Sequence, residues 1–144
     1  MKDAIKDTAA RMMGVVHRNT LRLSGGRLGN RAFGMPTVML ETVGRKSGKR
    51  RTTVLTSPLQ ESSRVVLVAS YGGDDRHPSW YLNLRDNPDV VLTANGETRP
   101  MRARTAAGEE RAELWPKVVD IYKGYGEYQE RTDRQIPIVI LEPA

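Results

Sequence analysis

The sequence predicts an α+β fold in which a mostly antiparallel sheet of six or seven strands curls into a barrel flanked by helices. Three observations support this prediction. Six runs of apolar and β-branched residues are joined mainly by short connections, and only two or three stretches have helical periodicity. Two of the runs flank Asn95-Gly96, a dipeptide typical of the type I′ turn that joins antiparallel strands.

The chain of 144 residues is expected to form one domain, since it shows no repeat and no linker. Residues 1–34 are predicted to hold a helix at 3–23 followed by a loop, and residues 35–144 the barrel. Ile5, Met12 and Val16 lie near one stripe of that helix, with basic residues elsewhere. A basic amphipathic helix either covers a core or lies on an anionic membrane surface, and the sequence leaves both interpretations open.

The expected strands follow the apolar runs along the chain. They are residues 35–43, 52–59, 64–70, 88–94, 97–106 and 136–141. A short helix is expected at 79–85, after Pro78, because proline suits the start of a helix. A second helical stretch begins near residue 109 and contains Pro116, which either starts a new turn or kinks the helix.

The composition restricts the functional classes. A formal charge of +6 and a pI of about 9.9 favour an anionic partner, whether a nucleotide, an acidic cofactor, nucleic acid or a membrane surface. The absence of cysteine excludes disulfides, thiolate metal sites and a cysteine nucleophile. The two histidines show no metal-binding spacing, so no metal site is expected. Without a signal peptide or a long apolar run, the protein is expected to be cytoplasmic.

The stretch V-G-R-K-S-G-K-R-R, residues 43–51, lies between the first two predicted strands. Five of its nine residues are cationic, namely Arg45, Lys46, Lys49, Arg50 and Arg51, and none is acidic. Gly44 and Gly48 allow the backbone to bend. Such a turn presents guanidinium, ammonium and backbone N–H groups to one small volume, which suits a phosphate or polycarboxylate. A solvated hairpin turn would contain the same residues, so this turn by itself does not decide the function.

Two further segments suggest a pocket. Gly72-Gly73 allows the backbone to pass close to a ligand, whereas Trp80 and His77, taken by themselves, are interpreted as a core residue and a loop residue. Further along, three tyrosines recur at intervals of three, at positions 122, 125 and 128, with glycines between them. This pattern fits a lid over a pocket and fits equally well a set of rings that cap the barrel.

Several ordered motifs together resemble the deazaflavin-dependent nitroreductase family. They are V-G-R-K-S-G-K-R-R at 43–51, V-A-S-Y-G-G at 68–73, H-P-S-W-Y-L-N-L-R-D-N-P at 77–88, and W-P-K-V-V-D-I-Y-K-G-Y-G-E-Y-Q-E-R-T-D-R-Q-I-P at 115–137, with the final strand. The match covers about residues 37–143. The resemblance implies a split β-barrel that binds reduced coenzyme F420 (F420H2), a 5-deazaflavin with an anionic phosphate and oligoglutamate tail. It also implies hydride transfer from C5 to a quinone, a nitroaromatic or an α,β-unsaturated lactone or ester.

The resemblance carries roles over to particular positions. The cofactor-binding set that it implies is Arg45, Lys46, Ser47, Arg51, Val54, Ser70, Tyr71, Gly72, Gly73, Trp80 and Tyr122. The catalytic set is Tyr122, Ser70, Tyr125 and Tyr128, which would donate hydrogen bonds to the acceptor, with protonation from solvent or a tyrosine left open. Two positions depart from the family pattern, since Val54 replaces a usual proline and Tyr71 stands where a lysine can occur.

Two other functional classes fit the sequence less well. An FMN-binding split-barrel oxidoreductase would need to hold only one phosphate, which five clustered cations exceed. A basic nucleic-acid-binding barrel would place aromatic residues along exposed strands, whereas here they cluster in helical segments. The expected partner is therefore a small-molecule acceptor and not nucleic acid, with peripheral contact to the inner face of the membrane through the N-terminal helix as a further expectation. The sequence leaves the physiological acceptor and the oligomeric state open.

Overall fold

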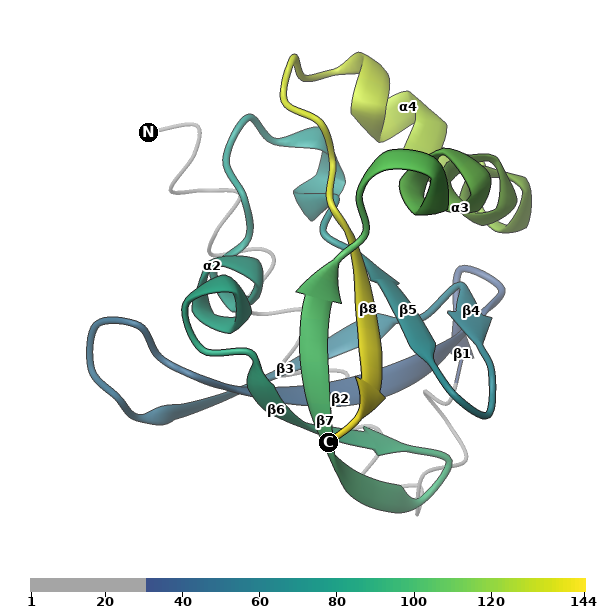
Figure 1. Ribbon diagram of the computed structural model, residues 1–144. Coiled ribbons are helices and arrows are strands. Elements are labelled where there is room, and N and C mark those ends of the chain that lie inside the picture. Colours follow the sequence, from purple (N-terminus) through teal and green to yellow (C-terminus); the bar gives the residue numbers. More distant parts are fainter. Residues whose placement is uncertain (1–30) are drawn as a thin grey trace.

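The structure of this protein is a computed structural model that describes residues 31–144. The predicted helix at 3–23 and residues 24–30 of the predicted loop lie outside the described residues, and within the rest of that loop Arg31–Ala32 form a short strand. The described chain forms one curled sheet with helices on two sides (Figure 1). Its elements are β1 (Arg31–Ala32), β2 (Met35–Val43), β3 (Arg50–Thr56), β4 (Leu59–Gln60), β5 (Val65–Val68), η1 (Tyr71–Gly73), α2 (Ser79–Asp86), β6 (Asp89–Ala94), β7 (Glu97–Thr105), α3 (Gly108–Ile121), α4 (Gly124–Glu130) and β8 (Ile138–Pro143).

The sheet order requires the sheet to curl. Its strands run β1-β2-β6-β7-β8-β5-β4, with β3 also paired to β2, and every pairing is antiparallel. β3 and β4 therefore belong to opposite ends of the sheet, although only Ser57 and Pro58 connect them. Because so short a link spans at most about 10 Å, the two ends must lie close together. The buried Ser57 hydroxyl stabilises this corner by donating to the carbonyls of Val66 (2.8 Å) and Leu59 (3.2 Å).

Two apolar clusters account for the continuous hydrophobic runs of β5 and β8. Val139 and Leu141 of β8 face the interior of the barrel, where they pack with Leu40 and Leu92. The alternate residues of β8 face the other way, into a second cluster with the helices α3 and α4; this cluster contains Ile138, Ile140, Leu114, Val118 and Tyr125. Because β5 divides in the same manner, both strands are buried on both faces, which explains why they lack polar alternation.

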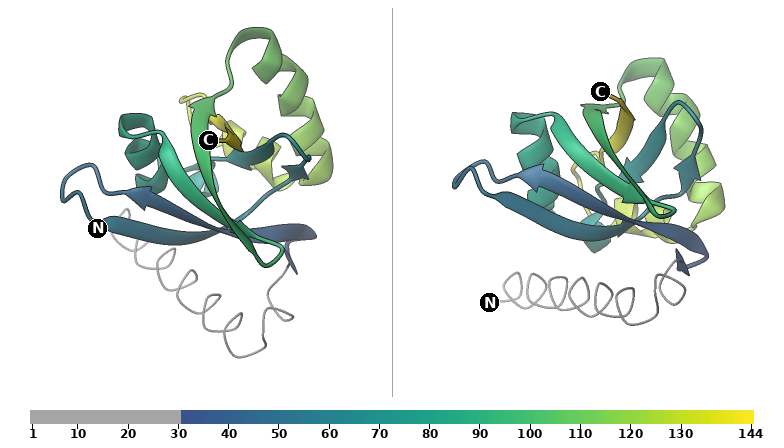
Figure 2. Two further views of the ribbon diagram at one scale, coloured as in Figure 1. Left: turned by 60° about the horizontal axis from the view of Figure 1, so that its bottom comes forward. Right: turned by 90° about the horizontal axis from the view of Figure 1, so that it is seen from below.

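The helices occupy different sides of the sheet. α2 packs against β2 and β7, beside the base of the β2–β3 hairpin, whose turn extends beyond the barrel (Figure 1). The helices α3 and α4 lie on the side away from that turn, as both views in Figure 2 show. In the described part of the chain, no helix is long and apolar enough to cross a lipid bilayer. This arrangement is the split barrel that the resemblance implied.

Most of the predicted elements are confirmed, with three local differences. The strand at 35–43 has the predicted bounds, whereas the strand at 52–59 divides into β3 and β4 at the Ser57 corner. The predicted strand at 64–70 ends at Val68, and residues 71–73 form a tight turn. The stretch from residue 109 forms two helices, which separate at Tyr122, while Pro116 is accommodated inside α3.

Candidate functional site

The basic hairpin turn, residues 43–51, has a defined backbone. The amide of Gly44 donates to the carbonyl of Lys49 (2.7 Å), and the amide of Gly48 donates to the carbonyl of Gly44 (2.8 Å). Gly48 has φ +72°, a conformation that favours glycine. A Cβ atom on Gly44 would stand 3.0 Å from Ser47 Oγ and 3.1 Å from the carbonyl oxygen of Lys49. Both glycines are therefore required by the geometry of the turn.

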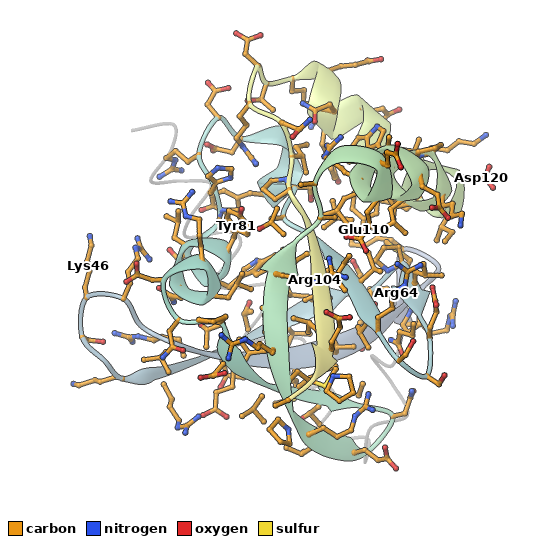
Figure 3. The ribbon with its side chains drawn as sticks, viewed as in Figure 1. Lys46, Arg64, Tyr81, Arg104, Glu110 and Asp120 are labelled. Atoms are coloured by element: carbon orange, nitrogen blue, oxygen red, sulfur yellow. The ribbon has the colours of Figure 1, made fainter. Side chains whose placement is uncertain are left out.

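The five cations of this turn have different surroundings. Arg50 forms an exposed ion pair with Glu41 (3.0 Å), so part of its charge is compensated. Lys46, Lys49 and Arg51 form no ion pair with any residue between 31 and 144. Lys46 projects into solvent at the tip of the hairpin, away from the barrel (Figure 3). The outer part of the hairpin is thus an exposed, uncompensated cationic surface.

Arg45 differs because it is held against the barrel. Its backbone N–H and its Nη1 both donate to Oδ1 of Asn83 on α2, at 3.2 and 2.9 Å. The Nδ2 of Asn83, which is 5% exposed, in turn donates to the hydroxyl of buried Thr42 (3.2 Å). A neutral amide therefore orients the Arg45 guanidinium without compensating its charge. Only Nη1 takes part in this contact, so the other guanidinium N–H groups can donate to a ligand.

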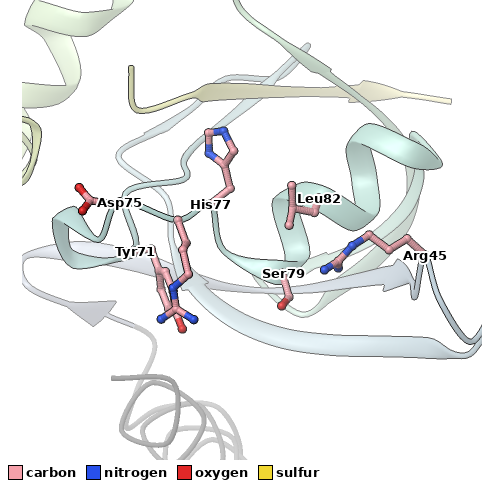
Figure 4. Close-up of a pocket in the computed structure, with 7 residues that line it drawn as sticks. Arg45, Tyr71, Asp75, His77, Ser79 and Leu82 are labelled. Carbon is pink, nitrogen blue, oxygen red and sulfur yellow. The ribbon is translucent and has the colours of Figure 1, made fainter. Parts of the chain in front are cut away.

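A cavity of about 420 Å³ connects this arginine with the turn after β5. Its lining residues come from the basic hairpin, η1, the following loop and α2 (Figure 4); they are Arg45, Tyr71, Asp75, Arg76, His77, Ser79 and Leu82. The guanidinium of Arg76 lies 5.7 Å from the centre of the Tyr71 ring and pairs with the carboxylate of Asp74 (3.2 Å). The cavity therefore has at one end the Arg45 guanidinium, which pairs with no carboxylate of residues 31–144, and at the other end an aromatic ring.

The S-Y-G-G turn, residues 70–73, forms the wall of this cavity at Tyr71 and is strongly bent. Tyr71, Gly72 and Gly73 all have positive φ, at 46°, 64° and 83°. A Cβ atom on Gly73 would stand 2.8 Å from the carbonyl oxygen of Tyr128, so α4 packs directly on the turn. Tyr71 of this turn therefore lines the cavity, while Gly73 of the same turn contacts the tyrosine-bearing helix.

The three tyrosines form one cluster next to the S-Y-G-G turn. The hydroxyls of Tyr122 and Tyr128 are 3.2 Å apart, and the rings of Tyr122 and Tyr125 meet edge to face at 5.0 Å between centroids. Tyr125 is 3% exposed, and its hydroxyl lies 3.5 Å from both Thr56 Oγ1 and Met35 Sδ. The pKa of Tyr122 is raised to about 12, mainly by the hydrogen bond with the Tyr128 hydroxyl and secondly by burial. Burial raises the pKa of Tyr125 to about 12 as well. Both are therefore neutral hydrogen-bonding groups near pH 7.

His77 lies at the cavity wall, but its ring points away from the other labelled side chains (Figure 4). Its Nδ1 lies 3.1 Å from Nη1 of Arg134, and because a guanidinium can only donate, Nδ1 accepts and Nε2 carries the proton. Burial and the nearby Arg134 and Arg85 lower the pKa of His77 below its ordinary value. The imidazole is thus neutral near pH 7.

The structure places the predicted site residues in several parts of the fold. Arg45 and Tyr71 line the cavity, with Ser70, Gly72 and Gly73 in the adjoining turn, and the tyrosine cluster packs on that turn. Lys46, Ser47 and Arg51 lie along the hairpin outside the cavity. Val54 lies opposite Met39 in the middle of β3, and Trp80 packs against the interior of the barrel. The catalytic and cofactor-binding roles of these residues remain predictions.

Sequence reasoning missed part of the cavity wall. Ser79 and Leu82 line the cavity, and Asn83 contacts Arg45 beside it. All three belong to the motif at 77–88, but nothing in the spacing of that motif distinguished them. Asp75 and Arg76 precede it in the same loop. The packing of α2 beside the hairpin brings this motif and the loop before it next to Arg45.

Comparisons with known proteins show which family the sequence and the fold match. The model of a family described as F420H(2)-dependent quinone reductase matches residues 14–143. The F420H(2)-dependent quinone reductase Rv1261c of Mycobacterium tuberculosis is 37% identical over 130 residues, which span 88% of this chain and 87% of that protein. Rv3178 of the same organism is 41% identical over 109 residues, or 76% of this chain and 91% of its own. A solved structure titled as an F420-H2 dependent reductase superposes with a TM-score of 0.67 at 44% identity, covering 74% of this chain and 94% of that one.

Proposed function

Since the chain belongs to the F420H(2)-dependent quinone reductase family, we propose that it uses F420H2 to reduce a small quinone-type acceptor. The observation that carries this proposal is the state of Arg45. Its guanidinium is oriented by a neutral amide, bears a charge that no described carboxylate compensates, and lines one end of the cavity. Those are the properties expected of a residue that binds an anionic group of a ligand.

The described residues fit the cofactor in charge and in extent. Arg45 at the cavity would bind the phosphate, while Lys46 and Lys49 in the turn and Arg51 at the start of β3 extend the positive surface along the hairpin, where an oligoglutamate tail would lie. Ser47 Oγ accepts from the Lys49 amide (3.2 Å), which leaves its O–H free to donate to the tail. The ring would occupy the end of the cavity near Tyr71 and the glycines of the S-Y-G-G turn.

The bound cofactor would supply a hydride to the acceptor. The chain's own contribution would be to hold the acceptor in place and to stabilise the negative charge that develops on its oxygen. We assign this second role to Tyr122 and Tyr128, whose hydroxyls form a pair at 3.2 Å, with Ser70 on the adjacent turn. With a pKa near 12, Tyr122 would donate a hydrogen bond and stay protonated, so the final proton would come from solvent.

Tyr125 would support this site through its contact with Tyr122. Its burial and its edge-to-face contact with Tyr122 indicate that it orients the Tyr122 ring. Direct contact of its hydroxyl with an acceptor would require the packing around Met35 and Thr56 to open.

The basic amphipathic sequence at 3–23 motivates one addition to this function. We propose that this segment brings the enzyme to the inner face of the membrane, where lipid-soluble quinones are found. Co-sedimentation with anionic vesicles should retain the full-length protein and lose a variant that lacks residues 1–23. Equal retention of both proteins would contradict this part of the proposal.

The deciding experiment is a binding titration of the purified full-length protein with coenzyme F420, with FMN run in parallel. We expect F420 to bind preferentially and to bind more weakly to Arg45→Met. Arg50→Met is the matched control, because this neighbouring cation is paired with Glu41 and does not line the cavity. Turnover of F420H2 with a soluble quinone should follow the same order. Preferential binding of FMN, or binding of neither cofactor, would overturn the proposal.

A further inference from the structure

Arg134 joins two parts of the site without lining the cavity. It follows α4, and its half-buried guanidinium donates to three backbone carbonyls that bracket the S-Y-G-G turn. These carbonyls belong to Ala69 (3.2 Å), Ser70 (2.9 Å) and Asp74 (2.8 Å). A fourth contact reaches His77 Nδ1 at 3.1 Å. No other described side chain makes hydrogen bonds to more than one carbonyl of this turn and its flanks.

The loop that carries Arg134 is itself tied to the tyrosine helix. Nε2 of Gln129 on α4 donates to the carbonyl of Arg134 (2.7 Å), and its Oε1 accepts from the amide of Ile136 (2.9 Å). Gln129 is the residue after Tyr128, whose hydroxyl faces that of Tyr122. Hydrogen bonds therefore connect Gln129, which follows Tyr128 in α4, through Arg134 to Ser70.

The S-Y-G-G turn needs such support because its own backbone does not favour this shape. Tyr71 has φ +46°, a conformation that costs free energy for any residue with a Cβ atom. β5 ends at Val68, and the last sheet-like bond at this point runs from the amide of Ala69 to the carbonyl of Pro137 (2.9 Å). Beyond it the Arg134 guanidinium replaces the hydrogen bonds that a neighbouring strand would supply.

We propose that Arg134 is a positioning residue of the reductase, which holds the S-Y-G-G turn and the tyrosine helix in one relative geometry. In this role it sets the distance between the cofactor side of the site, at Tyr71, and the acceptor side, at Tyr122 and Tyr128. The inference rests on the proposed function for the reaction that it serves. These contacts require a planar, forked donor, because Nε, Nη1 and Nη2 of Arg134 each donate to a different carbonyl and these carbonyls lie on both sides of the turn. An ammonium group carries the same charge but cannot reproduce that geometry.

The test compares Arg134→Lys with Arg111→Lys in the full-length protein. Arg111 is a matched control, since it is also half-buried and donates to one carbonyl, that of Ile136 (2.8 Å), but stacks on Trp115 outside the site. For each variant we would measure the melting temperature, the dissociation constant of F420, and kcat with F420H2 and a soluble quinone. We expect kcat of Arg134→Lys to fall roughly 10- to 100-fold, because a displacement of about 1 Å between reacting groups has that effect. The dissociation constant, determined mainly by the hairpin cations, should change less than about threefold.

A second measurement separates positioning from a general loss of stability. Guanidinium at a low, non-denaturing concentration should restore part of the kcat of Arg134→Ala and should have no effect on Arg111→Ala. If Arg134→Ala does not fold, Gln129→Met serves instead, because it releases the Arg134 loop from α4 and leaves the arginine in place. It should lower kcat in the same direction.

The outcomes distinguish the two hypotheses. Wild-type kcat in Arg134→Lys, or an equal loss of kcat in the two lysine variants at equal melting temperature, would overturn the role of Arg134 and leave the proposed function intact. Failure of the wild-type protein to bind F420 would overturn the proposed function and this inference with it.

Discussion

Replacement of Asn83 by leucine tests how the site holds Arg45. Asn83 is 5% exposed, and its amide accepts two hydrogen bonds from Arg45 and donates one to Thr42. Leucine has a similar size and fits a position beside the buried Leu84, but it makes none of these bonds. The change therefore removes the contact between α2 and the hairpin while it preserves most of the packing.

The expected size of the effect follows from these three bonds. A neutral hydrogen bond contributes about 0.5–1.5 kcal/mol and one to a charged group about 1.5–3 kcal/mol. Because Arg45 is exposed, we take the lower end and expect the free energy of unfolding to fall by about 2 kcal/mol. Cofactor binding must then also order the Arg45 side chain, at about 0.5–1.5 kcal/mol. The dissociation constant of F420 should therefore rise roughly 2- to 12-fold.

The assay is a double-mutant cycle with Arg45→Met, in which F420 affinity is measured for the wild type, both single variants and the double variant. Since Asn83 acts through Arg45, the double variant should bind no more weakly than Arg45→Met. Asn87→Ala is the control, because Asn87 ends the same helix and accepts only from the amide of Asp89 (3.1 Å). Unchanged affinity in Asn83→Leu, or fully additive effects, would refute this role of Asn83.

Three further predictions concern the tyrosine cluster and the S-Y-G-G turn. Tyr122→Phe should lower turnover about tenfold, the effect of one hydrogen bond in the transition state, and should change F420 affinity less. For Tyr125, burial raises the pKa from its ordinary value near 10 to about 12, so the folded state holds its proton more tightly than the unfolded state does. Its contribution to stability should be complete below pH 10 and be lost as the pH rises from 10 to 12. Gly73→Ala should lower the free energy of unfolding by at least about 1–2 kcal/mol, since φ is +83° and the added Cβ would stand 2.8 Å from a carbonyl oxygen.

Each of these predictions has a matched control. Tyr81→Phe removes a hydroxyl contact to Thr105 (2.9 Å) outside the site and should not alter turnover. Tyr125→Phe should lose less stability than the wild type between pH 10 and 12 in denaturant titrations, because Tyr122 then remains with a raised pKa but Tyr125 no longer titrates. An equal loss in the two proteins would refute the assignment. Gly72→Ala has a similar φ but no atom within 4 Å of the added Cβ, so it should cost less than Gly73→Ala in thermal melts. Equal costs would show that the contact with α4 is unimportant.

The local pattern of the sequence was sufficient to predict the strands and the basic hairpin. Alternating and continuous apolar runs identify β2, β5 and β8, and Asn95-Gly96 identifies the turn between β6 and β7, because these signals depend on neighbouring residues alone. The glycines at 44 and 48 are likewise required by the turn in which they occur. The motifs indicated the family, and with it the cofactor that the hairpin cations are proposed to bind.

Contacts between distant segments depended on the tertiary structure. Arg45 meets Asn83, 38 residues later in the sequence, only because the sheet register places α2 beside the hairpin. Arg134 meets the carbonyls of the S-Y-G-G turn, more than 60 residues earlier, because β8 pairs with β5 and brings the segments at their ends together. Spacing along the chain encodes which face of an element a side chain occupies. Which element that face meets is decided when the curled sheet brings its two ends together, and this depends on the whole core at once.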